Sequence, residues 1–341
     1  MICKMKIFCK KFSSNRNYGI ELEIGNEVSP HFISSVIRNS SNVPVKNNLY
    51  RSSINNNYWD VKMDGSCGKT TDEFGMNEGG YEITTFKASG HKQLQHICKV
   101  IQDIKKIGVK VNKNCGLHVH VDISDFTEED VGRLIQHWLF VERIILMAVP
   151  DRRRCNKYCM PFSYNERYSL RENATAIEVW NHYKPSHILS HNNIDRRKTM
   201  NLVNYCRYLR VKKFKRSTVE FRFPEGTLSA NIVKNWVRLL IEFVNNVKNN
   251  DIYLEYLNKK NFRDQLYVLG LGNSKNCFNI FSKSLRETKA WFLKRILRYG
   301  YDSNVSSILL TNTMIWGDED VKEEVFKILS EMGATHEAHK K

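Results

Sequence analysis

The chain has 341 residues, and 53 Lys and Arg against 36 Asp and Glu give it a net charge of +17. A hydrophobic share of 41% can build a packed core and excludes a disordered or fibrous protein, while no apolar run is long enough to span a membrane. Lysines interrupt the first twelve residues, so we expect no signal peptide, and nine irregularly spaced cysteines favour reduced thiols in a cytoplasmic setting.

Segments that alternate apolar and polar residues predict strands with one buried face. In chain order the predicted strands are residues 19–25, 58–64, 81–85, 117–122 and 218–223. The Ser- and Asn-rich stretch 39–57 predicts a surface loop or sheet edge, and residues 65–80 predict a loop. The sequence therefore favours an α+β fold with an antiparallel sheet that helices cover on one face.

Helices are predicted between these strands from apolar residues at helical spacing. One covers residues 94–104, and another starts at a cap formed by Thr127 and Asp130 and ends at Pro150. A third carries Val233 to Val244 and is expected to be capped by Asn231, and the remainder of the chain is expected to be mostly helical.

The polar side of the predicted strands carries an unusual set of groups. They are Glu21 and Glu23, Asp64, Glu82, His118 and His120, and Glu220 and Arg222. If the strands are neighbours, one sheet face collects up to five carboxylates, two imidazoles and an arginine. Carboxylates at that density need cations, and hard oxygen donors with few imidazoles favour Mg²⁺ or Mn²⁺ together with substrate phosphates. An ordinary solvated face is the alternative, but three strands that carry only Glu, His and Arg there argue against it.

The same residues form an ordered series of short motifs. These are Gly19-Ile-Glu21-Leu-Glu23, Asp64-Gly-Ser66, Glu82, Gly116-Leu-His118-Val-His120, Lys198-Thr-Met-Asn201 and Thr218-Val-Glu220-Phe-Arg222-Phe-Pro-Glu-Gly226. Their order and spacing resemble the amidoligase family, which is similar in fold to glutamine synthetase and the glutamate–cysteine ligases. The resemblance implies a curved antiparallel sheet of the glutamine-synthetase type that holds ATP and two or more Mg²⁺. It implies an ATP-dependent ligase that joins a carboxylate to an amine through an acyl phosphate.

The resemblance implies a role in metal binding, catalysis or substrate contact for individual residues of this sequence. The implied metal ligands are Glu21, Glu23, Asp64, Glu82, His118 and Glu220. Arg222 resembles the phosphate-contacting arginine and acts with Glu220 in catalysis, while His120, Lys198 and Asn201 are expected to contact ATP or substrate. Asp72, Glu73 and Glu78 compete for the place of the third carboxylate. No side-chain nucleophile is needed, so Ser66 and the cysteines are expected to be structural.

The resemblance also divides the chain. We expect a basic lead-in over residues 1–17, an amidoligase-like catalytic domain over 18–247 and a helical extension over 248–341. Nine basic residues and no acid lie between Arg196 and Arg216, directly before the strand with Glu220 and Arg222. This segment is expected to face an anionic substrate, and the acid and amine that are joined could be amino acids or peptides.

Three other readings remain open. Basic and aromatic residues alternate in the 196–216 segment, as they do in proteins that bind nucleic acid. A phosphotransferase could use the same sheet face. Zinc could be bound by His118 with His120, or by Cys155 and Cys159 with the histidines at 182, 187 and 191, but the first group is rich in carboxylates and the second is irregularly spaced.

Overall fold

We describe the protein from a computed structural model. The described residues are 16–47, 57–67, 79–154, 156–169, 174–183, 194–210, 216–249, 252–271 and 283–300. The competing acids Asp72, Glu73 and Glu78 lie outside these residues, as do Cys155, two of the three histidines of the proposed zinc group and the end of the helical extension.

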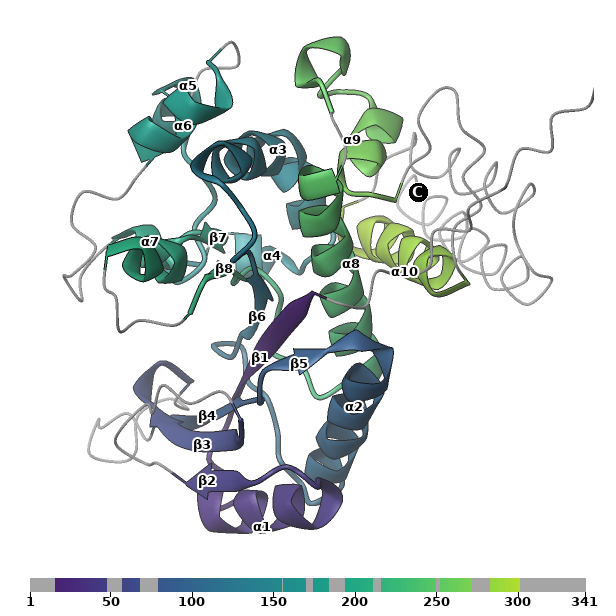
Figure 1. Ribbon diagram of the computed structural model, residues 1–341. Coiled ribbons are helices and arrows are strands. Elements are labelled where there is room, and N and C mark those ends of the chain that lie inside the picture. The colour runs from purple at the N-terminus through teal and green to yellow at the C-terminus, as the bar shows by residue number, and fades with distance from the viewer. Residues whose placement is uncertain are drawn as a thin grey trace, which may run out of the picture.

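An eight-stranded sheet forms the centre of the fold (Figure 1). Its strands are β1 (Asn17–Ile24), β2 (Val45–Asn47), β3 (Trp59–Asp64), β4 (Gly80–Thr84), β5 (Ala88–Ser89), β6 (Leu117–Asp122), β7 (Met200–Asn201) and β8 (Thr218–Phe221). The order is β2-β3-β4-β1-β6-β8-β7, and β5 pairs with β1. The predicted strands are confirmed as β1, β3, β4, β6 and β8.

The prediction of an antiparallel sheet is wrong at one edge, where β2 and β3 pair in parallel, so the sheet is mixed. All other paired strands in the described residues are antiparallel. The alternation of side chains shows which residues face the core, but it contains no information about the direction of an edge strand. β2 lies in the stretch that the sequence predicted as a loop or sheet edge, and it forms that edge.

The described helices are α1 (Pro30–Ser40), α2 (Gly90–Lys106), α3 (Glu128–Met147), α4 (Asp151–Arg154), α5 (Tyr164–Ser169), α6 (Ala176–Tyr183), α7 (Val203–Arg210), α8 (Ala230–Asn249), α9 (Phe262–Val268) and α10 (Lys283–Tyr299), with 3₁₀ turns η1 (Gly65–Cys67), η2 (Ile194–Arg197) and η3 (Leu254–Tyr256). The cap of α3 is confirmed, because Thr127 Oγ1 accepts from the Asp130 amide and Asp130 accepts from the Thr127 amide. The predicted cap at Asn231 is wrong, because α8 begins at Ala230 and Asn231 lies inside its first turn. There Asn231 Oδ1 accepts a hydrogen bond from the side-chain amide of Asn235.

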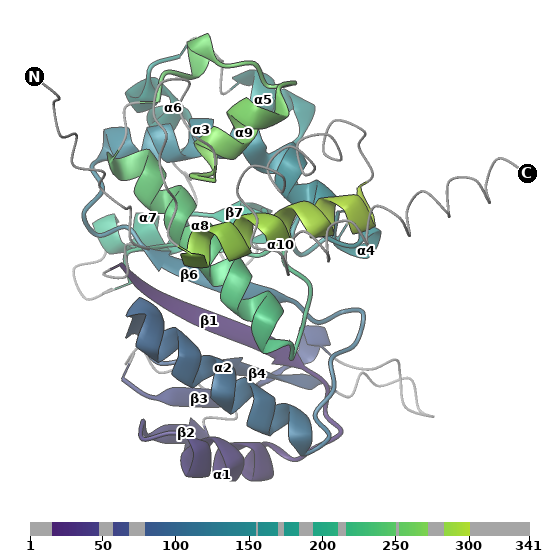
Figure 2. The same ribbon diagram turned by 90° about the vertical axis from the view of Figure 1, so that its right-hand side faces the viewer.

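The apolar face of the sheet forms the core with the helices. Ile20, Leu117 and Val219 are fully buried, and Trp138 of α3 packs against Phe221 of β8 with ring centroids 5.2 Å apart. Figures 1 and 2 show α2 and α8 side by side over this face. The long helices α2 and α8 cover the apolar face, and the polar groups of β1, β4, β6 and β8 lie together on the opposite face.

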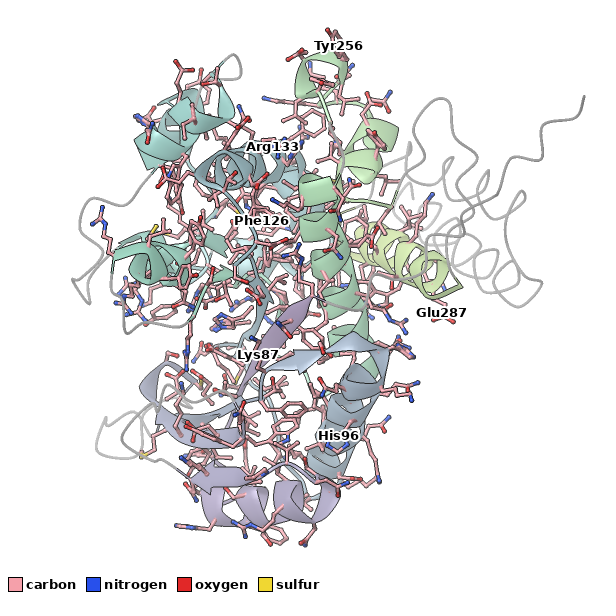
Figure 3. All side chains as sticks on the ribbon, viewed as in Figure 1. Lys87, His96, Phe126, Arg133, Tyr256 and Glu287 are labelled. Atoms are coloured by element: carbon pink, nitrogen blue, oxygen red, sulfur yellow. The ribbon has the colours of Figure 1, made fainter. Side chains whose placement is uncertain are left out.

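The last described helix, α10, packs across α8 (Figure 2). Arg295 of α10 forms a buried ion pair with Glu225, three residues after Arg222. Nearer the start of α10, Glu287 pairs with Arg238 of α8 at 3.3 Å (Figure 3). The domain boundary at residue 247 stays a prediction. No helix in the described residues is long and apolar enough to cross a membrane.

Candidate active site

Strand register brings the polar groups together. β1 lies between β4 and β6, so Glu23 stands opposite Glu82 and Glu21 stands opposite His118. On the next pair of strands His120 stands opposite Glu220. We call Glu21, Glu23, Glu82, His118, His120 and Glu220 the carboxylate row. It extends over four adjacent strands, although its members are up to 199 residues apart in the chain.

His118 is the centre of the row. Its Nδ1 lies 3.2 Å from Glu21 and 3.6 Å from Glu220, and its Nε2 lies 3.3 Å from Glu23. The imidazole is 4% exposed, so three carboxylates surround a buried ring. His120 adds a contact of 3.1 Å to the second oxygen of Glu21. These contacts hold the carboxylates close together in a water-poor environment.

Two residues hold Glu220, one just past the end of its own strand β8 and one from the neighbouring strand β7. The Arg222 guanidinium pairs with Oε1, and the Asn201 amide of β7 donates to Oε2 at 2.7 Å. Arg222 also donates to the Tyr158 carbonyl at 3.2 Å. Both oxygens of Glu220 therefore have fixed directions, and Arg222 stands at the edge of the row.

At the other end of the row, Lys62 of β3 pairs with Glu82 at 2.7 Å. Lys62 was not among the predicted site residues, although the alternation of residues 58–64 puts it on the same face as Asp64. Arg153 was not predicted either. It is 2% exposed and donates to the carbonyls of Arg222 and Phe223, just after β8. No local pattern reveals Arg153, because its partners are backbone groups some 70 residues away.

Burial and neighbouring charges divide the carboxylates into two kinds. Burial opposes ionisation of Glu21, but His120 and His118 hold its pKa well below the usual range. Glu220 is also buried, and the charge of Arg222 lowers its pKa. Burial, followed by the charge of Glu21, instead raises the pKa of Glu82 to about 7. Burial opposes protonation of His120, but Glu21 and Glu220 raise its pKa. In the absence of a metal, protons therefore supply part of the positive charge in the row.

We expect Glu82→Gln to stabilise the metal-free protein at high pH. The folded-state pKa of about 7 exceeds the reference value of 4.5, so this carboxyl contributes stability below pH 4.5 that is lost as pH rises through about 7. Glutamine keeps the neutral form, and the variant should gain about 1–3 kcal/mol over wild type at about pH 8 and almost nothing at about pH 5. Urea unfolding in a chelator measures both values. Exposed Glu255→Gln is the control, and a larger gain at low pH would contradict the prediction.

Ligand atoms for a cation come together in two groups of the described residues. Glu21, His118 and Glu220 form one, and Glu23, Asp64 and Cys67 form the other, with the ligand atoms of each group within 4.8 Å of one another. The first group has two carboxylates and one imidazole, which suits Mg²⁺ or Mn²⁺. The second contains the thiol of Cys67, whereas the sequence predicted only structural roles for the cysteines.

Lys198 is the one predicted site residue that lies apart from the row. Its ammonium pairs with Glu166 of α5 at 2.6 Å and lies over the ring of Phe162. A contact with phosphate or substrate would require the buried Lys198 to leave this ion pair. The role of Lys198 in the site stays a prediction.

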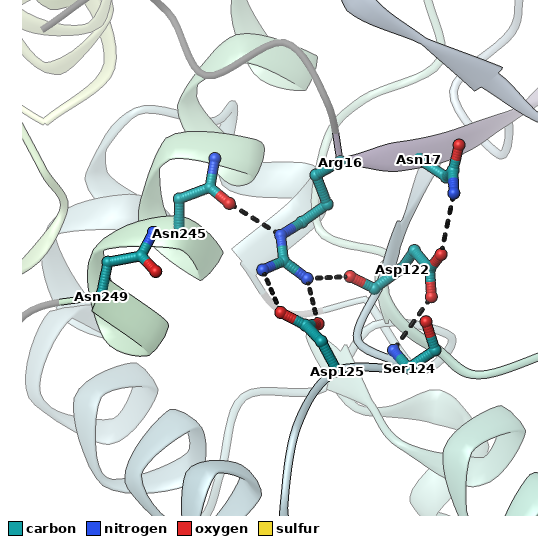
Figure 4. A pocket seen from close by; sticks show the side chains of 7 residues that line it. All are labelled: Arg16, Asn17, Asp122, Ser124, Asp125, Asn245 and Asn249. Atoms are coloured by element: carbon teal, nitrogen blue, oxygen red, sulfur yellow. Dashed lines mark hydrogen bonds and ion pairs between the residues drawn. The ribbon is translucent and has the colours of Figure 1, made fainter.

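A separate polar pocket lies where β1 begins (Figure 4). Its lining residues are Arg16, Asn17, Asp122, Ser124, Asp125, Asn245 and Asn249. Arg16 crosses it with two bonds to Asp125, at 2.6 and 2.9 Å, and one to Asn245 at 2.7 Å. Arg16 and Lys248 also lie over the ring of Phe126, which Figure 3 labels. Through its contact with Asn245, Arg16 thus connects the start of β1 to α8 across this pocket.

Comparison with protein families identifies the family to which the chain belongs. A family model described as "Putative amidoligase enzyme" matches residues 14–244, more than half of the chain. The matched stretch includes all eight strands and most of α8, and so every residue of the carboxylate row. A search of curated proteins found no match. The chain belongs to the amidoligase family.

Proposed function

We propose that this protein is an ATP- and Mg²⁺-dependent ligase that joins a carboxylate to an amine. One observation carries the proposal, namely the carboxylate row with His118 between Glu21, Glu23 and Glu220 and with Arg222 at its edge. A structural sheet face has no need for buried like charges at this density. A site for metal-bound phosphates needs them, because the carboxylates hold the cations and arginine neutralises the transferred group.

Glu21, His118 and Glu220 would hold one Mg²⁺, and Glu23 and Glu82 would offer oxygens for another. The bound ions would supply charge neutralisation for the phosphates of ATP. Before a cation binds, Asn201 and Arg222 fix both oxygens of Glu220, and the Asn201 contact can keep its orientation afterwards. A cation on Glu220 and Glu82 would compete with their ion pairs, and this would free Arg222 and Lys62 to contact anionic oxygens. Lys62 and Arg222 are then the two basic groups at opposite ends of the row.

The reaction has two steps. A carboxylate oxygen of the acid attacks the γ-phosphorus of ATP, ADP leaves and an acyl phosphate forms. The amine then attacks the acyl carbon, phosphate leaves and the amine loses a proton. Arg222 is placed to stabilise the charge on the transferred phosphoryl group, and the row aligns the reactants. No side-chain nucleophile is required.

Incubation with ATP, Mg²⁺ and pools of amino acids and short peptides tests the proposal. Release of ADP and phosphate should depend on the acid, and mass spectrometry should find a product of acid plus amine minus water. Hydroxylamine should trap the acyl phosphate as a hydroxamate when the amine is omitted. A stable phosphorylated product without an amide would show a phosphotransferase instead.

Gly19 offers a test of where the substrates lie. It stands opposite His120 on the polar face of β1, and a Cβ built on it has no heavy atom of the described residues within 4 Å. The space above Gly19 is therefore available to a ligand beside Glu21. We expect Gly19→Leu to raise the KM of a substrate by about tenfold or more while the melting temperature changes little. Gly19→Ala is the graded control, and an unchanged kcat/KM in the leucine variant would contradict this placement.

A further inference from the structure

Helix α10 lies beyond the stretch that the family model matches, yet it places a buried charge close to the carboxylate row. The match ends at residue 244, whereas α10 packs against α3 and α8 (Figure 2). Arg295 of this helix pairs at 2.5 Å with Glu225, which follows β8. We propose that Arg295 is a positioning residue for the ligase site and acts through Glu225 and Gly116 on Glu23, an inference that rests on the proposed function.

Several contacts fix the buried Arg295 side chain. Its Nε donates to the carbonyl of Ala148, the C-cap of α3, at 2.8 Å. Its guanidinium carbon lies 5.6 Å from the centre of the Trp236 ring on α8 and 5.3 Å from that of Trp291 on α10. These contacts join three helices around the guanidinium and direct it toward Glu225.

Glu225 depends on this arginine for charge compensation. It is 6% exposed, and its Oε2 has no hydrogen-bond partner among the described residues. A buried carboxylate is costly unless a cation pairs with it, and loss of the cation leaves an uncompensated charge. Arg295 supplies that cation through Oε1 and so holds the segment that follows Arg222.

The backbone of Glu225 is joined to the residue directly before β6. Gly116 and Glu225 form an antiparallel bridge, and beside it the Gly226 amide donates to the Cys115 carbonyl at 2.9 Å. A shift of Glu225 therefore moves Gly116, which lies two residues before His118.

Gly116 contacts Glu23 from both of its backbone groups. Its carbonyl accepts from the Glu23 amide at 3.1 Å, and its amide donates to Glu23 Oε2. The other carboxylate oxygen of Glu23 lies 3.3 Å from His118 Nε2. Gly116 thus sets the direction of a carboxylate to which the proposed function gives a cation, and it is itself held through Glu225 by Arg295.

A second link joins the end of α10 to the arginine of the row. Arg154 of α4 donates to the carbonyl of Tyr299, the last residue of α10. Its neighbour Arg153 donates to the carbonyl of Arg222 at 2.6 Å. Helix α10 therefore supports the row at Glu23 and also at Arg222.

Hydrogen exchange in the metal-free full chain tests the link with no assumption about the reaction. Arg295→Met keeps an apolar stem but removes the charge, so the amide of Gly116 should exchange faster by about tenfold or more. Peptides from β3 and β4 should keep their wild-type rates, because these strands lie on the far side of β1 from β6 and β8. Unchanged exchange at Gly116, or an equal acceleration over the whole sheet, would overturn the proposal.

Mn²⁺ binding, followed by electron paramagnetic resonance of the free ion, tests the effect on the site. Arg295→Met should weaken binding by about tenfold or more at a temperature where the variant is folded, since residues that orient metal ligands matter by such factors. Arg295→Lys keeps the charge and should retain most of the affinity. Arg298→Met, exposed on the same helix, is the matched control and should bind like wild type. Wild-type affinity in Arg295→Met would refute a positioning role.

A double variant covers the case in which Arg295→Met fails to fold. Glu225→Gln combined with Arg295→Met leaves no buried charge unpaired, and it should fold and show the same weakened Mn²⁺ binding. Undiminished binding in this protein would also count against the proposal. A wild-type protein that binds no Mn²⁺ would contradict the proposed function, and the exchange of Gly116 would then decide by itself whether Arg295 holds this part of the row.

Discussion

Glu220→Gln should abolish amide formation and the ATP hydrolysis that accompanies it. Glu220 is 5% exposed, lies in the first ligand group and pairs with Arg222. Glutamine keeps the shape but removes the charge that binds a cation and orients the arginine, so we expect the rate to fall by about 10³ or more. Steady-state release of phosphate, measured with saturating ATP and Mg²⁺, gives the size of the loss.

Two controls separate this loss from a folding defect. Glu255→Gln changes the same functional group at an exposed position of η3 and should leave the rate unchanged. Stabilisation by Mg²⁺, followed as a rise in melting temperature, should be present in wild type and in Glu255→Gln and should be weakened in Glu220→Gln. Full turnover by the Glu220 variant would refute the metal assignment and, with it, the proposed mechanism.

Gly132→Ala should destabilise the protein strongly, although alanine is normally the better helix residue. A Cβ on Gly132 would lie 1.7 Å from the carbonyl oxygen of Ala176, and this close approach lets α3 pack against α6. Helix propensity alone predicts a gain of about 1 kcal/mol, whereas the clash with backbone should cost about 3 kcal/mol or more. Because α3 also carries Trp138 beneath β8, activity should be lost at temperatures where wild type is stable.

Urea unfolding followed by tryptophan fluorescence measures the effect. Gly19→Ala is the comparison, since its Cβ meets no heavy atom within 4 Å in the part of the chain that the structure describes. Its free energy of unfolding should equal that of wild type or exceed it slightly. A Gly132→Ala protein as stable as wild type would mean that α3 and α6 are not packed as closely as described.

The contents of the polar face could be predicted from the sequence because alternation is a local property. Side chains two residues apart on a strand share a face whatever the strand pairs with, so Glu21 with Glu23 and His118 with His120 could be grouped without a fold. Capping of α3 by Thr127 and Asp130 is local in the same way. By contrast, Asn231 was assigned to a cap on residue type alone, and the true start of α8 depends on how that helix packs.

Pairing could not be predicted, because it depends on contacts between distant segments. Nothing in the strand of Glu21 specifies that His118 lies opposite it, or that Lys62 and Arg222 stand at opposite ends of the row. The predicted substrate contact Lys198 lies beside Glu166 for the same reason, since α5 is placed by tertiary packing. The parallel direction of β2 is a further example.

The sequence by itself determined that this protein has a sheet with one apolar face and one face of carboxylates, histidines and an arginine, because the period of a strand is local and strict. It also determined the net charge of +17 and the resemblance that led to the amidoligase family. Only the tertiary structure decided the order and register of the strands, which place His118 among three carboxylates and bring Cys67 beside Glu23 and Asp64. The physical reason is that these contacts join residues far apart in the chain, and the packing of the whole core fixes them.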